Sequence, residues 1–419
     1  MLKQVQGKVE RDRHVIEAVV RRFGPVSRAR IHELTDIRLS ALSTLVRELL
    51  AEGRLAEAGV EASALGRKGV LLQLNEGFGS VVGIEFDDES VTAGVTDLHP
   101  RIRHCVTEPV RLNGGVAGLV DQLVSLTRRA LREAGVRRRD LIGIGVADPG
   151  LVDSQRGVTV TSSMIPFWKD VALREIFARQ FRVPVLVEAR TRAKAVAEHE
   201  CKAVERPPDS MIYIDYGSGI GAGLYVDGRL LYGQGSAAGE FGHTAVSVGG
   251  PVCACGSFGC LEAVAGLRAV EARIRQVIHE GARTDVLEMA GGDVSRISGW
   301  MVFAAASDGD KAASNVVAEI ARYLGLGLAN LVNLFNPGLI VLDARLRVAG
   351  ENLLQQVEGV VRRQALRESQ SQVTIRYASV TEAAGVIGVV EMVLAKHFEV
   401  PAFRPPPFLV AGNYEERVG

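Results

Sequence analysis

The segment Gly239–Glu262, GEFGHTAVSVGGPVCACGSFGCLE, is the part of this 419-residue chain that says most about its fold. Within eighteen residues it carries one imidazole and three thiols, on His243, Cys253, Cys255 and Cys260. Such a ligand set is typical of a closed tetrahedral zinc site, in which four protein ligands leave no position for a substrate water. The sequence therefore predicts a structural Zn²⁺ at these four residues. A disulfide or unbound core thiols are the alternatives.

The same segment resembles the motif of the ROK family, whose members are repressors, open reading frames and sugar kinases. GEFGH comes first and C-x-C-G-x-x-G-C-L-E follows, in the order and at the separation of that family. The resemblance implies that Glu240, His243 and Glu262 hydrogen-bond the hydroxyls of a sugar, with the second ring nitrogen of His243 free for zinc. For Glu240 and Glu262, a role at a helix end or beside the zinc is the alternative.

The resemblance also implies an actin-like, two-lobed α/β fold, which we expect over residues 76–398 with a lobe boundary near 190–210. Strand and helix patterns alternate through this region. A strand, glycine turn and strand near residue 81 recur near residue 211, as expected for two related lobes around a cleft. The proline-rich residues 399–419 are expected to form a separate tail.

The overall composition favours neither a nucleic acid nor a membrane as partner, because 49 Lys and Arg balance 49 Asp and Glu. No charge-free run of eighteen apolar residues is present, and the first residues lack the apolar core of a signal peptide. The number of cysteines is odd, and three of the five lie at one site, which suits a reducing compartment better than a disulfide scaffold. We therefore expect a cytoplasmic protein.

Residues 1–75 show the order of a winged helix-turn-helix module, which binds double-stranded DNA. Apolar residues at helical spacing predict three helices, and two strand-like runs joined by a glycine-containing loop predict the wing, over residues 12–24, 28–37, 39–53, 54–59 and 70–75. Ser27 is placed to cap the second helix. Thirteen basic against nine acidic residues give this region 13 − 9 = +4.

The third helix is expected to enter the major groove, with further contacts from the second helix and the wing. The predicted DNA-binding residues are Arg28, Arg30, Arg38, Ser40, Ser43, Thr44, Arg47, Arg67 and Lys68. The alternative is a three-helix protein-interaction module with a solvated basic face. One departure from the family's repressors is at Arg38, Leu39 and Ala41, where those proteins usually have a small polar cap and a polar face. We therefore expect recognition of the DNA sequence to depend more on the wing and on DNA shape.

Three departures from the family's kinase motifs argue against phosphoryl transfer. The run that should carry the catalytic Asp reads Ala189–Arg192, the first phosphate turn reads Glu85–Glu89, and the adenosine turn reads Asp343–Arg345. A cationic Arg190 cannot accept a hydroxyl proton, and carboxylates in the phosphate turn repel ATP. Only the second phosphate turn, 217–221, keeps its glycines. We therefore expect no kinase activity.

The sugar pocket is expected to be altered as well. Met164 stands where the family uses an Asn, and Arg190, with Arg192 and Lys194, stands where the sugar's 6-hydroxyl would point. A guanidinium suits a phosphate or carboxylate better than a hydroxyl, so the hypothesis is an anionic sugar as effector. A structural ion pair at Arg190 is the alternative.

The sequence thus predicts a DNA-binding transcriptional regulator, a repressor of carbohydrate-related genes, whose ligand binds a disabled sugar-kinase fold. Because one winged helix reads one half-site, a homodimer or dimer of dimers on a palindromic operator is expected. One alternative is a sugar kinase of this family with an accessory N-terminal module. The other is a ligand-binding scaffold that contacts proteins.

Overall fold

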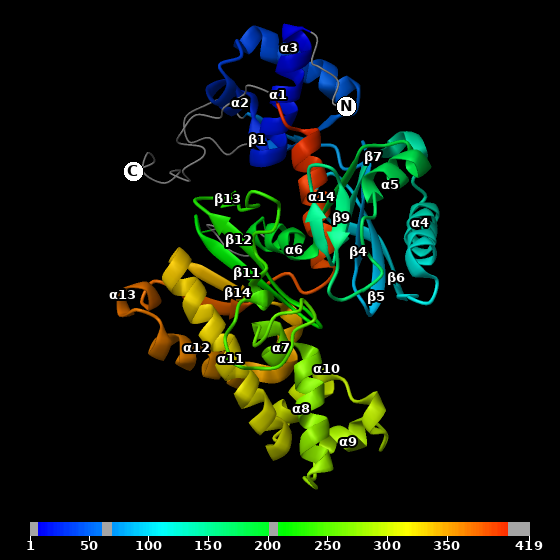
Figure 1. Cartoon of the computed structure of the whole chain (residues 1–419). Helices are drawn as coiled ribbons and strands as arrows, with labels where there is room; N and C mark the ends of the chain where they lie inside the picture. Colours follow the sequence, from blue (N-terminus) through cyan, green and yellow to red (C-terminus); the bar gives the residue numbers. More distant parts are fainter. Residues whose placement is uncertain (1–6, 61–68, 201–207, 401–419) are drawn as a thin grey trace.

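The computed structural model of the protein describes residues 7–60, 69–200 and 208–400. The chain forms an N-terminal domain and a two-lobed α/β body beneath it (Figure 1). Arg67 and Lys68, predicted on the wing, lie outside the described residues, as does most of the tail predicted over 399–419.

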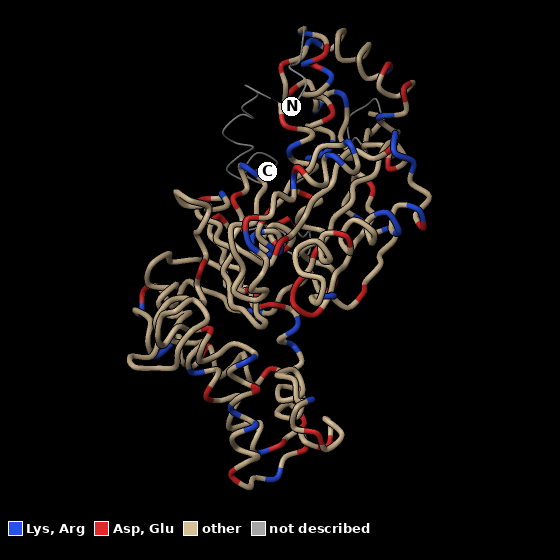
Figure 2. Tube along the Cα trace, turned by 45° about the vertical axis from the view of Figure 1, so that its right-hand side comes forward, with Lys and Arg blue, Asp and Glu red and all other residues tan. Residues whose placement is uncertain are grey.

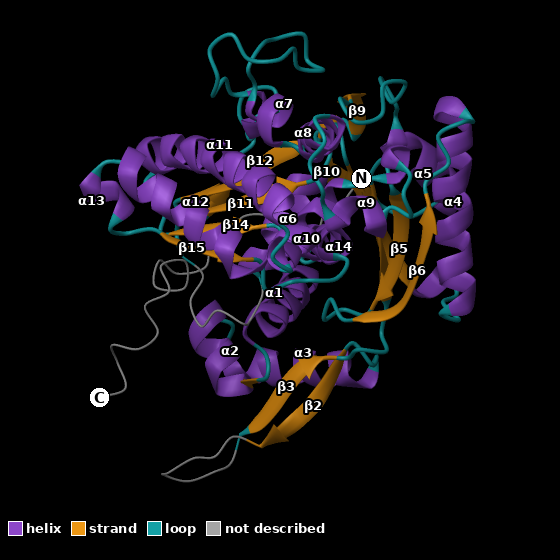
Figure 3. Ribbon diagram, turned by 90° about the horizontal axis from the view of Figure 1, so that it is seen from below, coloured by secondary structure: helices purple, strands orange, loops and turns teal. Residues whose placement is uncertain are grey.

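The N-terminal domain has the predicted winged-helix order. Its elements are α1 (Lys8–Phe23), β1 (Val26–Ser27), α2 (Arg28–Thr35), α3 (Leu39–Ala51), β2 (Leu55–Val60) and β3 (Val70–Leu74). As predicted, Ser27 caps α2, since its Oγ accepts a hydrogen bond from the N–H of Arg30 at 3.4 Å. Strand β3 pairs antiparallel with both β1 and β2, and the β2–β3 hairpin extends away from the body (Figure 3).

Lobe 1 is a five-stranded sheet in the order β10-β7-β4-β5-β6. Its strands are β4 (Ser80–Phe86), β5 (Ser90–Thr96), β6 (Ile102–Pro109), β7 (Leu141–Asp148) and β10 (Val185–Ala189). The helices α4 (Gly115–Glu133) and α5 (Leu173–Phe181) and the hairpin of β8 (Leu151–Asp153) and β9 (Val158–Thr161) complete it. Apolar residues alternate along β5, and every residue of β4 except Glu85 is buried, so the central strand of the sheet is covered on both sides.

Lobe 2 repeats the strand order of lobe 1, as β13-β12-β11-β14-β15, which confirms the predicted pair of related lobes. The strands are β11 (Met211–Tyr216), β12 (Ile220–Val226), β13 (Arg229–Leu230), β14 (Leu339–Leu342) and β15 (Thr374–Tyr377). The helices are α7 (Leu261–Ala265), α8 (Leu267–His279), α9 (Asp285–Met289), α10 (Gly299–Ser307), α11 (Lys311–Phe335), α12 (Gly350–Gln364) and α13 (Arg367–Gln370). In each lobe the first strand forms a hairpin with the second and lies parallel to the fourth.

Two helices, α6 (Arg190–His199) and α14 (Ala384–His397), lie between the sheets of the two lobes (Figure 1). They cross at backbone contact, because a Cβ added at Gly388 would lie 1.8 Å from the carbonyl oxygen of Ala193. Only glycine leaves room for such a crossing. The two helices therefore form one packed unit.

The core of the N-terminal domain continues into the body beyond residue 75. Val390, Leu394 and Phe398 of α14 and the segment that follows it are buried in the same apolar cluster as α1, α2 and α3. Arg21 of α1 also donates to Glu391 of α14 at 2.6 Å. The last helix of the described chain thus joins the DNA-binding candidate to the two lobes.

Charged residues of both signs are interspersed over the N-terminal domain, and a further group lies where the two lobes meet (Figure 2). Among the described residues, none of the helices has both the length and the apolarity that crossing a bilayer requires.

Candidate functional site

The four predicted zinc ligands lie together in lobe 2. The ligand atoms of His243, Cys253, Cys255 and Cys260 all lie within 4.8 Å of one another. The Nδ1 of His243 is 3.6 Å from the Sγ of Cys253, and the Sγ atoms of Cys255 and Cys260 are 3.8 Å apart. With metal–sulfur distances of about 2.3 Å, a tetrahedral zinc site has ligand separations of this size. The donor set and spacing therefore fit Zn²⁺.

The zinc cluster is held by turns that glycine makes possible. Gly259 has a positive φ of 66°, and a Cβ there would lie 1.8 Å from the carbonyl oxygen of Ser247. Cys260 comes next and is the residue before α7, whose first turn contains Glu262. The spacing of the thiols thus depends on one residue that must be glycine.

His243 lies between the thiols of the cluster and Glu240, one of the residues predicted to bind a sugar. Its Nδ1 lies beside Cys253, and its Nε2 is 3.9 Å from the Oε2 of Glu240. Burial raises the pKa of Glu240, and the charge of His243 acts against that rise. Glu240 is therefore close enough to act either on a ligand or beside a metal-bound His243.

Glu262 lies at the meeting point of the two lobes. Its Oε2 accepts a hydrogen bond from the N–H of Ile220 at 3.1 Å. A Cβ added at Gly219 would lie 3.1 Å from this oxygen and 3.3 Å from the sulfur of Met164 of lobe 1. The hydrogen bond to Ile220 uses one oxygen of Glu262. Glu262 can therefore support the backbone through Oε2 and bind a ligand through its other oxygen.

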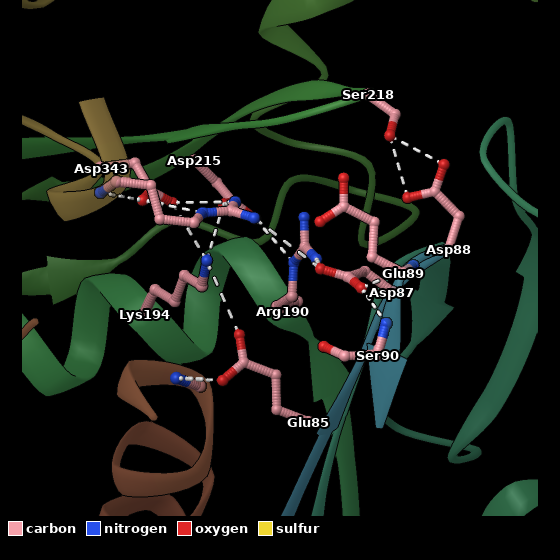
Figure 4. A network of polar contacts seen from close by, with 12 residues as sticks. Glu85, Asp87, Asp88, Glu89, Ser90, Arg190, Lys194, Asp215, Ser218 and Asp343 are labelled. Carbon is pink, nitrogen blue, oxygen red and sulfur yellow. Dashed lines mark hydrogen bonds and ion pairs between the residues drawn. The ribbon is translucent and has the colours of Figure 1, made fainter. Parts of the chain in front are cut away.

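The three segments predicted to depart from the family's kinase motifs meet in one cluster of charges between the lobes (Figure 4). We name this cluster the interlobe ion network. It consists of Glu85, Asp87, Arg190, Lys194, Asp215, Asp343 and Arg345. The members come from β4 and the turn after it, from α6, from β11, and from the segment that follows β14.

Two nitrogens of the Arg190 guanidinium are held by this network. Its Nη1 donates to Asp87 at 2.8 Å and its Nε donates to Asp215 at 2.9 Å, and the side chain is only 4% exposed. Burial alone would lower the pKa of Arg190, but the charges of Asp215 and Asp87 raise it. These contacts show that Arg190 forms structural ion pairs, which is the alternative to binding an anionic ligand. A guanidinium that already neutralises two carboxylates is poorly placed to hold an anionic ligand.

Lys194 and Arg345 are paired in the same way. The Nζ of Lys194 lies 2.9 Å from Asp215 and 3.0 Å from Asp343, and Arg345 donates to Asp343 at 3.1 Å. Burial would raise the pKa of Asp215, but Arg190 and Lys194 hold it well below its usual range. The carboxyl of Asp215 is therefore held in its charged form between these cations.

Arg192, the third cation considered for the effector, pairs with Glu188 at 2.7 Å and donates to the carbonyl oxygen of Ser236 at 3.0 Å. It is buried as well. Each cation predicted to meet an anionic sugar thus already contacts a carboxylate of the protein.

Sequence reasoning missed Asp215 altogether. This Asp sits in the otherwise apolar strand MIYIDY, and a buried carboxylate needs a cationic partner. This rule could have shown that Asp215 has a cationic partner. It could not have identified the partners, because they lie 21 to 130 residues away along the chain. Ser218, whose Oγ donates to Asp88 at 2.7 Å across the lobes, gave no comparable signal.

The predicted DNA-contacting residues of α3 form one exposed face. Arg38, Ser40, Ser43, Thr44 and Arg47 are all exposed, while the apolar residues of α3 are buried against α1 and α2. Arg28 and Arg30 at the start of α2 are partly buried, and Arg30 pairs with Glu33 at 2.7 Å. Leu39 is 51% exposed at the start of α3, where an apolar side chain could meet a thymine methyl group.

Comparison with known proteins places this geometry in a family. The ROK family matches residues 55–396. The xylose repressor of Caldicellulosiruptor bescii is 28% identical over 385 residues, which are 90% of this chain and 94% of that protein. The DNA-binding transcriptional dual regulator NagC of Escherichia coli is 28% identical over 357 residues, 83% of this chain and 84% of that protein.

Solved structures show the same fold. A ROK family transcriptional regulator, described as a homologue of the E. coli MLC protein, matches with a TM-score of 0.77 and 25% identity, over 93% of this chain and 98% of its own. A ROK family glucokinase from Streptomyces griseus, solved with glucose and AMPPNP, matches with a TM-score of 0.68 and 27% identity over 75% of this chain and 99% of its own. The two-lobed body therefore has the fold of both ROK regulators and ROK kinases, and the chain belongs to the ROK family.

Proposed function

We propose that the protein is a DNA-binding transcriptional repressor of carbohydrate-related genes. In this proposal residues 1–75 are the DNA-binding domain, 76–398 the two-lobed ligand-binding body and 399–419 a tail. The exposed polar face of α3, set on a winged-helix core, is the observation that carries it. The relatives that cover most of the chain are named as repressors, which supports the same function.

The DNA contacts we propose divide by role. Ser40, Ser43 and Thr44 would face the bases, while Arg38 and Arg47 would hold phosphates at the two ends of the helix. Arg28 and Arg30 would reach phosphates beside α2, and Arg67 and Lys68 would contact DNA from the wing. Because one such domain covers one half-site, a homodimer or dimer of dimers on a palindromic operator follows.

The effector we propose is a sugar bound by Glu240, His243 and Glu262. The position of Glu262 beside Gly219 and Met164, at the junction of the lobes, supports this placement. An anionic sugar is no longer favoured, since Arg190, Arg192 and Lys194 are each paired with carboxylates. A structural Zn²⁺ on the four cluster residues would hold the loop that carries two of these ligands.

Kinase activity is not part of the proposal. Arg190 lies at the position expected for the general base. It is a buried cation and cannot accept a proton at neutral pH. The match to a glucokinase covers 75% of this chain, whereas the match to a ROK family transcriptional regulator covers 93%.

The deciding experiment is fluorescence-anisotropy titration of the zinc-loaded protein against palindromic fragments from upstream of its own gene, at several salt concentrations. Selective binding with a steep salt slope, weakened by a sugar such as xylose or N-acetylglucosamine, is the expected result. Equal affinity for all fragments at every salt concentration overturns the proposal and turns attention to the protein-interaction alternative. A phosphoryl-transfer assay with ATP and hexoses is the companion measurement, and turnover there would restore the kinase alternative.

A further inference from the structure

The interlobe ion network joins parts of the molecule that are each unbalanced in charge. Lobe 1 contributes the carboxylates Glu85 and Asp87, while α6 contributes the cations Arg190 and Lys194 (Figure 4). Lobe 2 contributes two carboxylates and one cation, on Asp215, Asp343 and Arg345. Each cation contacts at least one carboxylate of lobe 1 and one of lobe 2, so the pairs are complete only when the lobes lie together.

Asp87 is the member that reaches across from lobe 1, and its two oxygens have separate tasks. Oδ1 accepts hydrogen bonds from the N–H groups of Glu89 and Ser90 and so shapes the turn between β4 and β5. Oδ2 accepts from Arg190 at 2.8 Å and lies 3.8 Å from Arg345 of lobe 2. The turn and the bridge between lobes can therefore be separated by a single substitution.

The next residue, Asp88, adds a second bridge at the edge of the same junction. Its carboxylate accepts from the Oγ of Ser218 at 2.7 Å and lies 3.3 Å from the guanidinium of Arg268, both in lobe 2. Two consecutive residues of one turn thus hold the opposite lobe, Asp87 through buried ions and Asp88 through a half-buried contact with Ser218 and an exposed one with Arg268.

The network is also connected to α14. Lys194 of α6 lies 3.6 Å from Glu85, whose other oxygen accepts from the N–H of Gly385 in the first turn of α14 at 3.0 Å. The far end of α14 is buried in the core of the N-terminal domain, through Val390 and Leu394. One rigid helix therefore spans from the ion network to the winged helix.

We propose that the interlobe ion network is a reversible bridge that holds the two lobes together without a bound ligand, and that its opening displaces α14 and with it the N-terminal domain. Buried ions suit a reversible contact, because charges that separate are hydrated again, whereas apolar surfaces that separate are not. A network of this kind gives two defined states, either of which a ligand can favour. The effect on DNA binding rests on the proposed function, while the bridge itself does not.

The test is hydrogen–deuterium exchange, read by mass spectrometry, on the full zinc-loaded chain and on its Asp87→Asn variant. Asn keeps the Oδ1 that shapes the turn and replaces the oxygen that faces Arg190 with an amide donor. We expect exchange to rise about tenfold in residues 216–220 of lobe 2 and in residues 384–390 of α14, because opening becomes easier. Glu319→Gln is the matched control, since it removes the exposed pair with Arg273 inside lobe 2.

A rise confined to the turn around residues 85–92, or no rise at all, overturns the bridge. Ser218→Ala gives an independent reading, because it removes only the half-buried contact with Asp88, which keeps Arg268 as a partner. It should raise exchange in the same two distant segments by a smaller factor, and unchanged exchange there also counts against the bridge.

DNA affinity is measured separately on the same samples. Absence of DNA binding by the unmodified protein counts against the proposed function and leaves the exchange result standing.

Discussion

The carboxylate of Glu85, at the end of the first strand of lobe 1, accepts a hydrogen bond from the backbone N–H of Gly385 at 3.0 Å, although 300 positions separate the two residues. An anionic group is favoured at this place, because the first turn of a helix carries unpaired N–H groups and the positive end of the helix dipole. The same carboxylate lies 3.6 Å from Lys194, so it belongs both to the ion network and to the start of α14.

Gly385→Ala should destabilise the protein. An added Cβ would lie between 2.5 and 2.8 Å from the carboxyl atoms of Glu85, so the ion pair or the helix must shift, at a cost of about 1–3 kcal/mol. Gly359→Ala in α12 is the control, since its Cβ would meet only the mobile end of Arg363 at 3.4 Å. That change should stabilise by up to about 1 kcal/mol. Urea unfolding of both variants checks the contrast, and equal effects would contradict it.

Asp87 should make stability depend on acid pH. Burial acts to raise its pKa, but Arg190 and the N–H groups of Ser90 and Glu89 lower it below the usual value. A carboxyl with a lowered pKa stabilises the fold above its unfolded pKa of about 4, and this contribution is lost as pH falls through the folded pKa.

We therefore expect Asp87→Asn to cost on the order of 3 kcal/mol at pH 7, because Arg190 loses a buried partner. The difference from the unmodified protein should shrink below about pH 4. Urea unfolding at a series of pH values from 3 to 7 measures this difference. A gap that stays constant with pH would show that the charge of Asp87 is not what stabilises the fold.

Cys255→Ser should release the metal. Cys255 is exposed, so replacing it costs little packing, yet it removes one of four thiolate or imidazole donors. Zinc affinity should fall at least about tenfold. Zinc content after dialysis against a chelator measures it, with Cys105→Ser as the control, because Cys105 is also an exposed thiol but lies in lobe 1. Equal zinc content in the two variants would remove Cys255 from the site.

Arg47→Ala should weaken binding to every DNA fragment by a similar factor. Arg47 is exposed on α3, and a lost phosphate contact reduces the slope of log affinity against log salt by about 1. Arg132→Ala, an exposed arginine of α4 in lobe 1, should leave both the affinity and the slope unchanged. Anisotropy titrations at four salt concentrations distinguish the variants. A matching loss in both would point to net charge instead of a defined contact.

Leu394→Ala should affect DNA binding although Leu394 lies far from α3 in the sequence. It is fully buried in the core shared by α14 and the N-terminal domain, so its truncation should cost about 2–5 kcal/mol. Leu123→Ala makes a similar cavity under α4, in the core of lobe 1. We expect only the first to lower DNA affinity at a temperature where both proteins are folded, and the reverse pattern would separate α14 from DNA binding.

Local patterns were the predictable part of this structure. The helices of the winged domain follow from apolar residues such as Leu42 and Leu49 at helical spacing, and the zinc cluster follows from ligands only a few residues apart. The repeat of the two lobes was visible because both open with the same strand and glycine turn.

Long-range pairing was not predictable. Asp87, Arg190 and Arg345 each lie in a segment where the sequence predicts a departure from a kinase motif, but nothing in the local sequence says that they neutralise one another. The sequence therefore leaves Arg190 between an anionic ligand and a structural ion pair, and its contacts with Asp87 and Asp215 are those of the ion pair. The core shared by α1 and α14 was not predictable for the same reason. Apolar periodicity shows which face of a helix is buried but not which element packs against it.

The placement of α14 has a consequence for synthesis on the ribosome. Arg21 and Glu391, which contact each other in the finished protein, emerge 370 residues apart. At about 5–20 residues per second, the N-terminal domain waits tens of seconds for the helix that completes its core. A chain released early would lack Val390 and Leu394, and so carry a winged helix with an open apolar face. Truncated translation products should therefore be poor competitors for the operator and good substrates for proteolysis.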